Sequence, residues 1–133
     1  MEIDAPVTIR DSLVARNSVS AYGPKGSIAF GGGVAMFGAD LTAERTAFVG
    51  NTVSATGGVA ALPFGGVSSA FGGGISNNIA PATLTLTDSV VTANRVSGSP
   101  GFLLGGGGVF NNFTFLRTRS VIAGNKPDDC LGC

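Results

Sequence analysis

The stretch Phe71-Gly72-Gly73-Gly74-Ile75, followed after a short interval by Leu84-Thr85-Leu86-Thr87-Asp88-Ser89-Val90-Val91-Thr92-Ala93-Asn94, contains the phrase from which the fold can be predicted. Related phrases occur along the whole chain, and each ends in an asparagine: Asn17, Asn51, Asn94 and Asn125. The intervals between these asparagines are unequal, whereas the residue types that precede each of them are similar from copy to copy. The chain is therefore a repeat protein in which insertions are confined to one part of the repeat.

Apolar and hydroxyl side chains alternate near the start of each phrase. Val7-Thr8-Ile9 and Leu84-Thr85-Leu86 show the period of two residues that is typical of a β-strand with one buried face. A strand of this length cannot bury its apolar face alone, so the copies are expected to stack as coils of a β-solenoid with parallel pairing. The interior column of this strand is expected to hold Ile9, Ala43, Leu86 and Arg117, of which only Arg117 is not apolar.

In a stack with its coils in register, equivalent residues form columns along the axis. The asparagine column (Asn17, Asn51, Asn94 and Asn125) and a hydroxyl column (Ser12, Thr46, Ser89 and Ser120) are expected at bends. There their side chains can hydrogen-bond backbone groups that leave the strand pairing. Blocks of three glycines, such as Gly72-Gly73-Gly74, provide bends that need a positive φ or a close approach of two backbones.

A column of alternating charge stands next to the hydroxyl column and consists of Asp11, Arg45, Asp88 and Arg119. Neighbours in one column of a parallel stack lie roughly 4.8 Å apart, so this order places each charge beside one of opposite sign. Exposed ion pairs contribute little to stability. The alternation would therefore mainly help to set the register of the coils, and an ordinary solvated edge of charged residues is the alternative interpretation.

The composition agrees with a stack of tight coils. The 133 residues include 22 glycines, and 44% are hydrophobic while only 12% are charged. This length suits a single β-helix domain over residues 1–133, either whole or as part of a longer array. Eight basic and eight acidic residues leave no net charge, so a nucleic-acid partner is not expected. The chain as given has no apolar run long enough for a membrane span and no signal peptide at Met1-Glu2-Ile3-Asp4.

Gly72-Gly73-Gly74-Ile75-Ser76-Asn77 and the phrase from Leu84 to Asn94 resemble the repeats of right-handed parallel β-helices of the polymorphic outer-membrane-protein and autotransporter-adhesin type. Asn125-Lys126-Pro127-Asp128-Asp129-Cys130 is similar to the segment with which such arrays often finish. The resemblance covers essentially the whole chain. It implies an all-β, right-handed parallel β-helix of about four coils with variable loops on one edge. It also implies an extracellular or bacterial cell-surface location, and it carries over no catalytic residue.

Residues suited to catalysis or to metal binding are few. The chain has no histidine, which removes the commonest metal ligand and the usual general base, and we predict no catalytic, cofactor-binding or metal-binding residue. Cys130 and Cys133 form a lone Cys-x-x-Cys without the further ligands of a closed zinc site. We expect them to form a small disulfide in an oxidising compartment. A redox role would need a helix N-terminus to lower the pKa of a thiol, and none is evident.

The segments between the asparagines and the glycine blocks, residues 18–30, 52–71 and 95–104, are expected to be loops that leave the stack at one bend and lie side by side. Their apolar residues next to the glycine blocks are expected in the core: Phe30, Phe71 and Leu104. The remaining residues are candidates for contact with a partner: Tyr22, Leu62, Phe64, Phe102 and Leu103. Together the loops would form either a second small core or an exposed apolar contact surface.

The sequence favours a non-enzymatic extracellular or cell-surface module with a role in structure or interaction. Its partners would be further copies, joined head to tail into fibres through the open β-helix ends or through the apolar loops, or a surface glycan or protein. The alternative is a carbohydrate-active β-helix enzyme, a polysaccharide lyase or hydrolase, that uses the charge column. Ice binding is a third hypothesis because of Thr83, Thr85 and Thr87, although the other copies do not continue a regular two-column threonine face.

Overall fold

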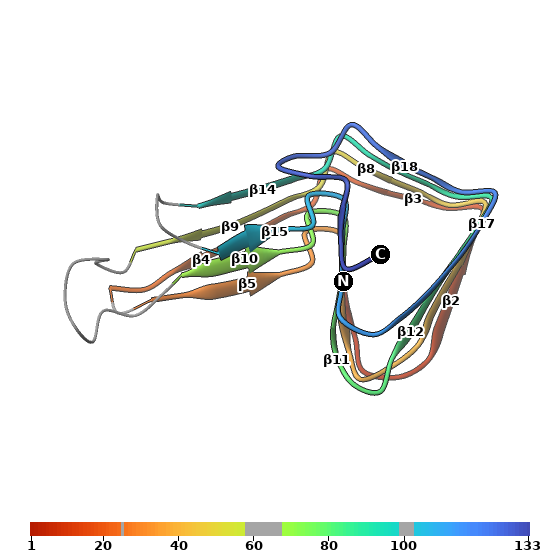
Figure 1. Cartoon of the computed structure of the whole chain (residues 1–133), viewed down its shortest axis with the longest axis horizontal. Coiled ribbons are helices and arrows are strands. Elements are labelled where there is room, and N and C mark those ends of the chain that lie inside the picture. Colours follow the sequence, from red (N-terminus) through yellow and green to blue (C-terminus); the bar gives the residue numbers. More distant parts are fainter. Residues whose placement is uncertain (25, 58–67, 99–102) are drawn as a thin grey trace.

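Parallel β-strands form the framework of the chain, for which a computed structural model describes residues 1–24, 26–57, 68–98 and 103–133. The strands form five sheets in which neighbouring strands come from successive coils and run in the same direction (Figure 1). The predicted all-β, parallel β-helix of about four coils is therefore confirmed. In this described part of the chain, no helix suited to crossing a membrane is present.

Three of the sheets enclose a prism that is triangular in cross-section (Figure 1). Sheet A consists of β1 (Glu2–Ile3), β6 (Val34–Phe37), β11 (Ile75–Ile79), β16 (Val109–Asn111) and β19 (Cys130–Leu131). Sheet B consists of β2 (Val7–Arg10), β7 (Leu41–Glu44), β12 (Thr83–Thr87) and β17 (Thr114–Thr118). Sheet C consists of β3 (Leu13–Ala15), β8 (Ala47–Val49), β13 (Val90–Thr92) and β18 (Val121–Ala123).

The other two sheets form an arm that projects from the corner between sheets C and A (Figure 1). Sheet D consists of β4 (Ser18–Tyr22), β9 (Thr52–Thr56) and β14 (Arg95–Gly98). Sheet E consists of β5 (Ile28–Phe30), β10 (Ser69–Phe71) and β15 (Leu103–Gly105). Much of what the sequence predicts to be loop is therefore strand. The reason is the alternation of small apolar residues, such as Val53 and Ala55 in β9, which buries one face of each strand.

Two separate hydrophobic cores result from this architecture. The prism is filled by side chains of sheets A, B and C, among which Phe48, Leu84 and Leu86 are fully buried. The arm has a smaller core between sheets D and E, made by Ala29, Val53, Ala55, Ala70 and Val96. The apolar residues of the insertions therefore form the second small core in part, while Tyr22 and Leu103 stay exposed.

The corner between sheets B and C has a left-handed backbone conformation in all four coils. The charge column occupies this corner, with φ angles of 48° at Asp11, 46° at Arg45, 50° at Asp88 and 45° at Arg119. L-residues enter this region at a cost of roughly 1–2 kcal/mol each. The pairing of the strands on both sides therefore has to hold each corner in place.

The glycine blocks form a neck where the returning strand of the arm enters sheet A. The first glycine of each block has a positive φ, which is 61° at Gly31, 70° at Gly72 and 64° at Gly106. The second glycine is enclosed by backbone, and a Cβ on Gly73 would collide with the carbonyl oxygen of Gly107 and lie 2.8 Å from the amide nitrogen of Arg95. Positive φ and close backbone approach thus both explain the glycine block.

Candidate interaction surfaces

The asparagine column forms a continuous chain of side-chain amides at the neck. The Nδ2 group of Asn17 donates to Oδ1 of Asn51, that of Asn51 to Asn94, and that of Asn94 to Asn125, each at 2.9 Å. Each Oδ1 also accepts the backbone N–H of the preceding asparagine. The Nδ2 groups of the last three residues donate in addition to backbone carbonyls of the coil before. This asparagine ladder satisfies the backbone groups where the chain leaves the prism.

Asp129 ends the asparagine ladder. Its Oδ1 accepts the backbone N–H of Asn125 at 2.8 Å and the Nδ2 group of Asn125 at 3.0 Å, as an asparagine of the next coil would do. All the amides donate toward this carboxylate, so a negative charge stands where the donors of the ladder point. The repeat does not reveal this role, because Asp129 lies only four residues after Asn125 and differs in type.

A second, shorter asparagine column lies at the end of sheet A. The Nδ2 group of Asn77 donates to Oδ1 of Asn111 at 2.8 Å, and the Nδ2 group of Asn111 donates to the carbonyl of Phe113 at 2.7 Å. In the described residues no donor reaches the buried Oδ1 of Asn77, because the preceding coil has Met36 in this column. The signal for this column was the asparagine that follows two glycine blocks, Gly72-Gly73-Gly74 and Gly106-Gly107-Gly108, at the same distance.

The hydroxyl column satisfies backbone groups at the corner between sheets B and C. The backbone N–H of Thr46 donates to Oγ of Ser89, and the backbone N–H of Ser89 donates to Oγ of Ser120. Each hydroxyl donates in turn to the carbonyl two residues earlier in its own coil, as Ser12 does to Arg10 at 2.6 Å. The hydroxyls therefore replace backbone partners at the bend.

The charge column consists of two ion pairs on the surface of the same corner. Arg45 donates to both carboxylate oxygens of Asp11 at 2.6 and 2.8 Å, and Arg119 donates to both oxygens of Asp88 at 2.6 Å. Among the described residues no ion pair joins Arg45 to Asp88. The column therefore alternates in sign, but its direct contacts are pairwise.

These hydrogen bonds shift the pKa values of both partners. Those from Arg45 lower the pKa of Asp11 below its ordinary value of 3.8, and those from Arg119 do the same for Asp88. The pKa values of both arginines rise because of the same bonds. A general acid needs a pKa that is raised toward the working pH. The shifts thus run opposite to what the acid of a carbohydrate-active enzyme would require.

The outer face of sheet B carries one column of hydroxyls and one column with an ion pair. Thr8, Thr42 and Thr85 stand in register in the first column, which continues with Leu116. In the second column Arg10 donates to Glu44 at 2.9 Å. The threonine face considered for ice binding is therefore interrupted in both columns.

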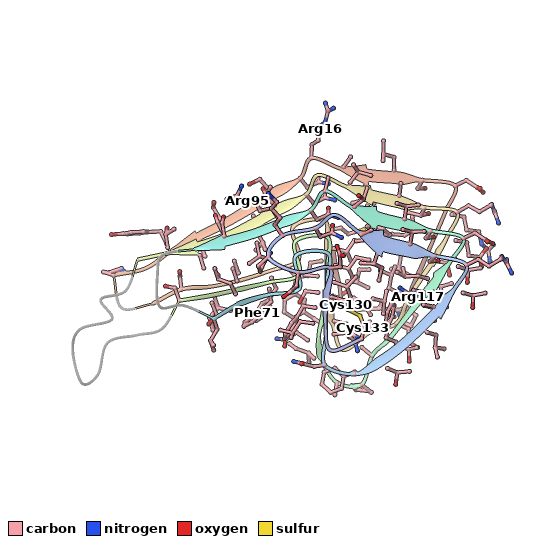
Figure 2. All side chains as sticks on the ribbon, turned by 45° about the horizontal axis from the view of Figure 1, so that its top comes forward. Arg16, Phe71, Arg95, Arg117, Cys130 and Cys133 are labelled. Carbon is pink, nitrogen blue, oxygen red and sulfur yellow. A yellow bond between two sulfur atoms is a disulfide. The ribbon has the colours of Figure 1, made fainter. Side chains whose placement is uncertain are left out.

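The C-terminal end of the prism is formed by a coil without an arm. After Asn125 the chain passes directly to β19, which pairs with β16, and the predicted disulfide between Cys130 and Cys133 is present. A depression of about 370 Å³ lies over this end of the core and is lined by Phe115, Arg117, Ile122, Asp129, Cys130 and Cys133. Arg117 stands in register with the buried Leu86, on the inner side of β17 and near both cysteines (Figure 2).

The contact residues predicted in the insertions lie in the arm or outside the described residues. Tyr22 ends β4 and is 77% exposed, and Leu103 begins β15 and is 65% exposed. Leu62, Phe64 and Phe102 lie outside the described residues. Ile28, which pairs with Ser69 in sheet E, is also an exposed apolar residue on the same sheet face as Leu103.

Phe30 and Phe71 lie outside both cores, contrary to expectation, because Ala29 and Ala70 take the inward positions of their strands. Their rings stack on each other with centroids 5.8 Å apart, and Phe71, which lies where the arm meets the prism (Figure 2), stacks on Phe110 of sheet A at 4.5 Å. Each such pair contributes about 0.5–1.5 kcal/mol beyond the burial of its area. The aromatic stack therefore holds the arm at a defined angle to the prism. Leu104, the third residue expected in a core, does pack against the arm core.

No cluster of three or more potential metal ligands occurs within residues 1–24, 26–57, 68–98 and 103–133. Known proteins offer no assignment for the surfaces described above. No protein-family model, no curated protein and no solved structure matches this chain.

Proposed function

We propose that this chain is a non-enzymatic extracellular or cell-surface interaction module in which the prism is a rigid support and the arm presents the contact surface. The observation that carries the proposal is the arm itself. It has its own core, it is braced by the stack of Phe71 on Phe110, and it exposes Ile28 and Leu103 on the outer face of sheet E, while Tyr22 is exposed on the opposite face of the arm. Exposed apolar side chains on a rigid support are typical of a contact surface.

One feature supports the extracellular part of this proposal. The disulfide between Cys130 and Cys133 is of a kind that persists in oxidising environments. The partner in this proposal is a surface glycan or a surface protein.

Binding to a printed array of neutral and acidic glycans, and to immobilised cell-surface proteins, tests the proposal. The variant Ile28→Ser/Leu103→Ser removes exposed apolar groups from one face of the arm, and Leu116→Ser removes an exposed leucine from the outer face of sheet B as a control. We expect at least one probe to bind, with affinity reduced about tenfold or more by the arm variant and unchanged by the control. Equal binding by both variants, or no binding to any probe, would contradict the proposal. Cleavage of an acidic polysaccharide that is abolished by Asp88→Asn would favour the enzyme alternative.

A further inference from the structure

The outer face of sheet C is apolar in every coil. Each strand of this sheet has three residues. The middle residue points into the prism core, and the first and third residues face solvent. The first outward column consists of Leu13, Ala47, Val90 and Val121, in register along the stack. Leu13 is 68% exposed, Val90 37% and Val121 53%. In the second outward column only Thr92 is polar.

This face differs from the outer faces of sheets B and D, its neighbours on either side. The corresponding face of sheet B carries mainly threonines and an ion pair, and that of sheet D carries hydroxyls such as Ser20 and Ser54, which are 2.8 Å apart. Strands that are apolar on both sides are typical of sheets that are covered on both sides. Single exposed apolar residues need no explanation, but a contiguous apolar column across four strands indicates a contact surface.

The charge column borders this apolar face and indicates which partner covers it. Along the stack its order is Asp11, Arg45, Asp88, Arg119, so reversing the direction of the axis exchanges every sign. A two-fold axis that runs parallel to the strands, midway between two facing copies of the sheet, performs this reversal. It sets Asp11 of one copy opposite Arg119 of the other, and Arg45 opposite Asp88. The same operation sets Leu13 opposite Val121, and Ala47 opposite Val90.

From this symmetry we infer that the outer face of sheet C binds a second copy of this chain, face to face and with opposed stack axes. The interface is isologous, as in most homodimers. The surface is accessible, since the arm bends away from the plane of sheet C at the neck (Figure 1). Aligned sheets pack about 10 Å apart, which lets the apolar columns meet while the charge columns meet at the border. Complementary border charges add selectivity more than affinity. This inference goes beyond the proposed function, because it concerns a different face and needs no foreign partner.

Two reciprocal charge variants test the arrangement. Asp88→Arg/Arg119→Asp keeps an ion pair within that half of the column but sets like charges against each other across the two-fold axis. Asp11→Arg/Arg45→Asp does the same with the opposite signs. We expect the wild-type chain to be a reversible dimer in sedimentation velocity, each variant alone to dissociate at about tenfold higher concentration or more, and their equimolar mixture to recover the wild-type affinity. Circular dichroism of each variant checks that the fold is retained.

A second pair of variants tests the apolar face independently of charge. Leu13→Ser/Val121→Ser is expected to weaken dimerisation by about tenfold or more, whereas Thr8→Ser/Thr118→Ser on sheet B leaves it unchanged. The inference is overturned if the wild-type chain stays monomeric up to about 1 mM, a range in which weak interfaces still associate. It is also overturned if the mixture of charge variants shows no recovery, or if oligomers grow beyond two copies, because a two-fold interface closes at the dimer.

Discussion

At the scale of single residues, the asparagine ladder has a direction. Each Nδ2 group donates toward the next coil and each Oδ1 accepts from the previous one, so every internal rung must both donate and accept. Asp129 only accepts, and it occupies the one place in the ladder where no donor is required. The chemistry of each rung therefore follows from its position in the stack.

This direction predicts that exchanging amide and carboxylate destabilises the folded chain much more at Asn94 than at Asp129. Asn94→Asp removes the donor that serves the carbonyl of Phe48 and Oδ1 of Asn125 and buries a charge, so we expect a loss of about 3 kcal/mol or more in the free energy of unfolding. Asp129→Asn keeps the acceptor and should cost about 1 kcal/mol or less. Urea denaturation of both variants measures the difference, and equal losses would contradict a directional ladder.

The charge column predicts a dependence of stability on pH. Folding lowers the pKa values of Asp11 and Asp88, so these carboxylates stabilise the folded chain while they are ionised, above the unfolded pKa near 3.8. The contribution is lost as the pH falls through the lowered values of the folded state. The Tm difference between the wild-type chain and Asp11→Asn/Asp88→Asn should therefore be small but measurable at pH 7 and should shrink below pH 3.8. A difference that stays constant down to pH 2 would exclude this linkage.

At the scale of structural elements, the neck is the place where a coil passes from the prism into the arm through a strand of sheet D and returns through a strand of sheet E. The third glycine of each block lies against the asparagine ladder, as Gly108 does against Asn125, where a Cβ would lie 2.7 Å from Nδ2. The glycine blocks and the asparagines therefore pack against each other in one junction. This contact explains why both recur together in each copy of the repeat.

The neck predicts a strong difference between two glycine substitutions. Gly73→Ala places a methyl group between backbone atoms of two coils that cannot move apart, so we expect a loss of about 3 kcal/mol or more, or no folding. Gly50 has φ 63° at an open bend, where the nearest atom to a Cβ would be Cγ of Arg16 at 3.9 Å. Gly50→Asn should cost about 1 kcal/mol or less, because asparagine tolerates this conformation. Thermal melting followed by circular dichroism compares the two, and similar losses would show that the neck is not tightly packed.

Much of this junction could be predicted from the sequence, because identical columns in a stack repeat the same residue type. The asparagines, the hydroxyls and the glycines are visible for that reason. Asp129 was not, since it performs the role of an asparagine with a different residue type inside the same coil. The arm strands were missed because their alternation uses small residues such as Ala21 and Ala55, which give a weak apolar signal. The tight pairing within each half of the charge column depends on side-chain conformations, which residue order does not determine.

At the scale of the whole molecule, the two ends of the prism are not equivalent. Val7, Ile9 and Val14 pack against the core at the N-terminal end, whereas Arg117 takes the place of an apolar residue at the C-terminal end. A charged residue that points inward at an open sheet edge disfavours the addition of further strands. Arg117 is thus positioned to limit the head-to-tail stacking expected for open β-helix ends.

We predict that Arg117→Leu promotes end-to-end association. Leucine would restore the column of Ile9, Ala43 and Leu86 and present an apolar end to the next copy. Light scattering should then show oligomers larger than two copies that grow with concentration and that the wild-type chain does not form. Thr118→Leu adds the same side chain to the outer face of that strand and serves as the control. An unchanged size distribution for Arg117→Leu would exclude this role of the arginine.

Because of the neck, coils can differ in their number of residues while the geometry of the prism stays the same. Successive asparagines of the ladder are 34, 43 and 31 residues apart, yet their amides meet at the same 2.9 Å. Intervals of different length thus leave the contacts of the ladder unchanged, so the segment beyond the neck is a natural place for grafting foreign epitopes. A recombinant library that varies only this segment would keep every residue of the ladder and of the three sheets that enclose the prism.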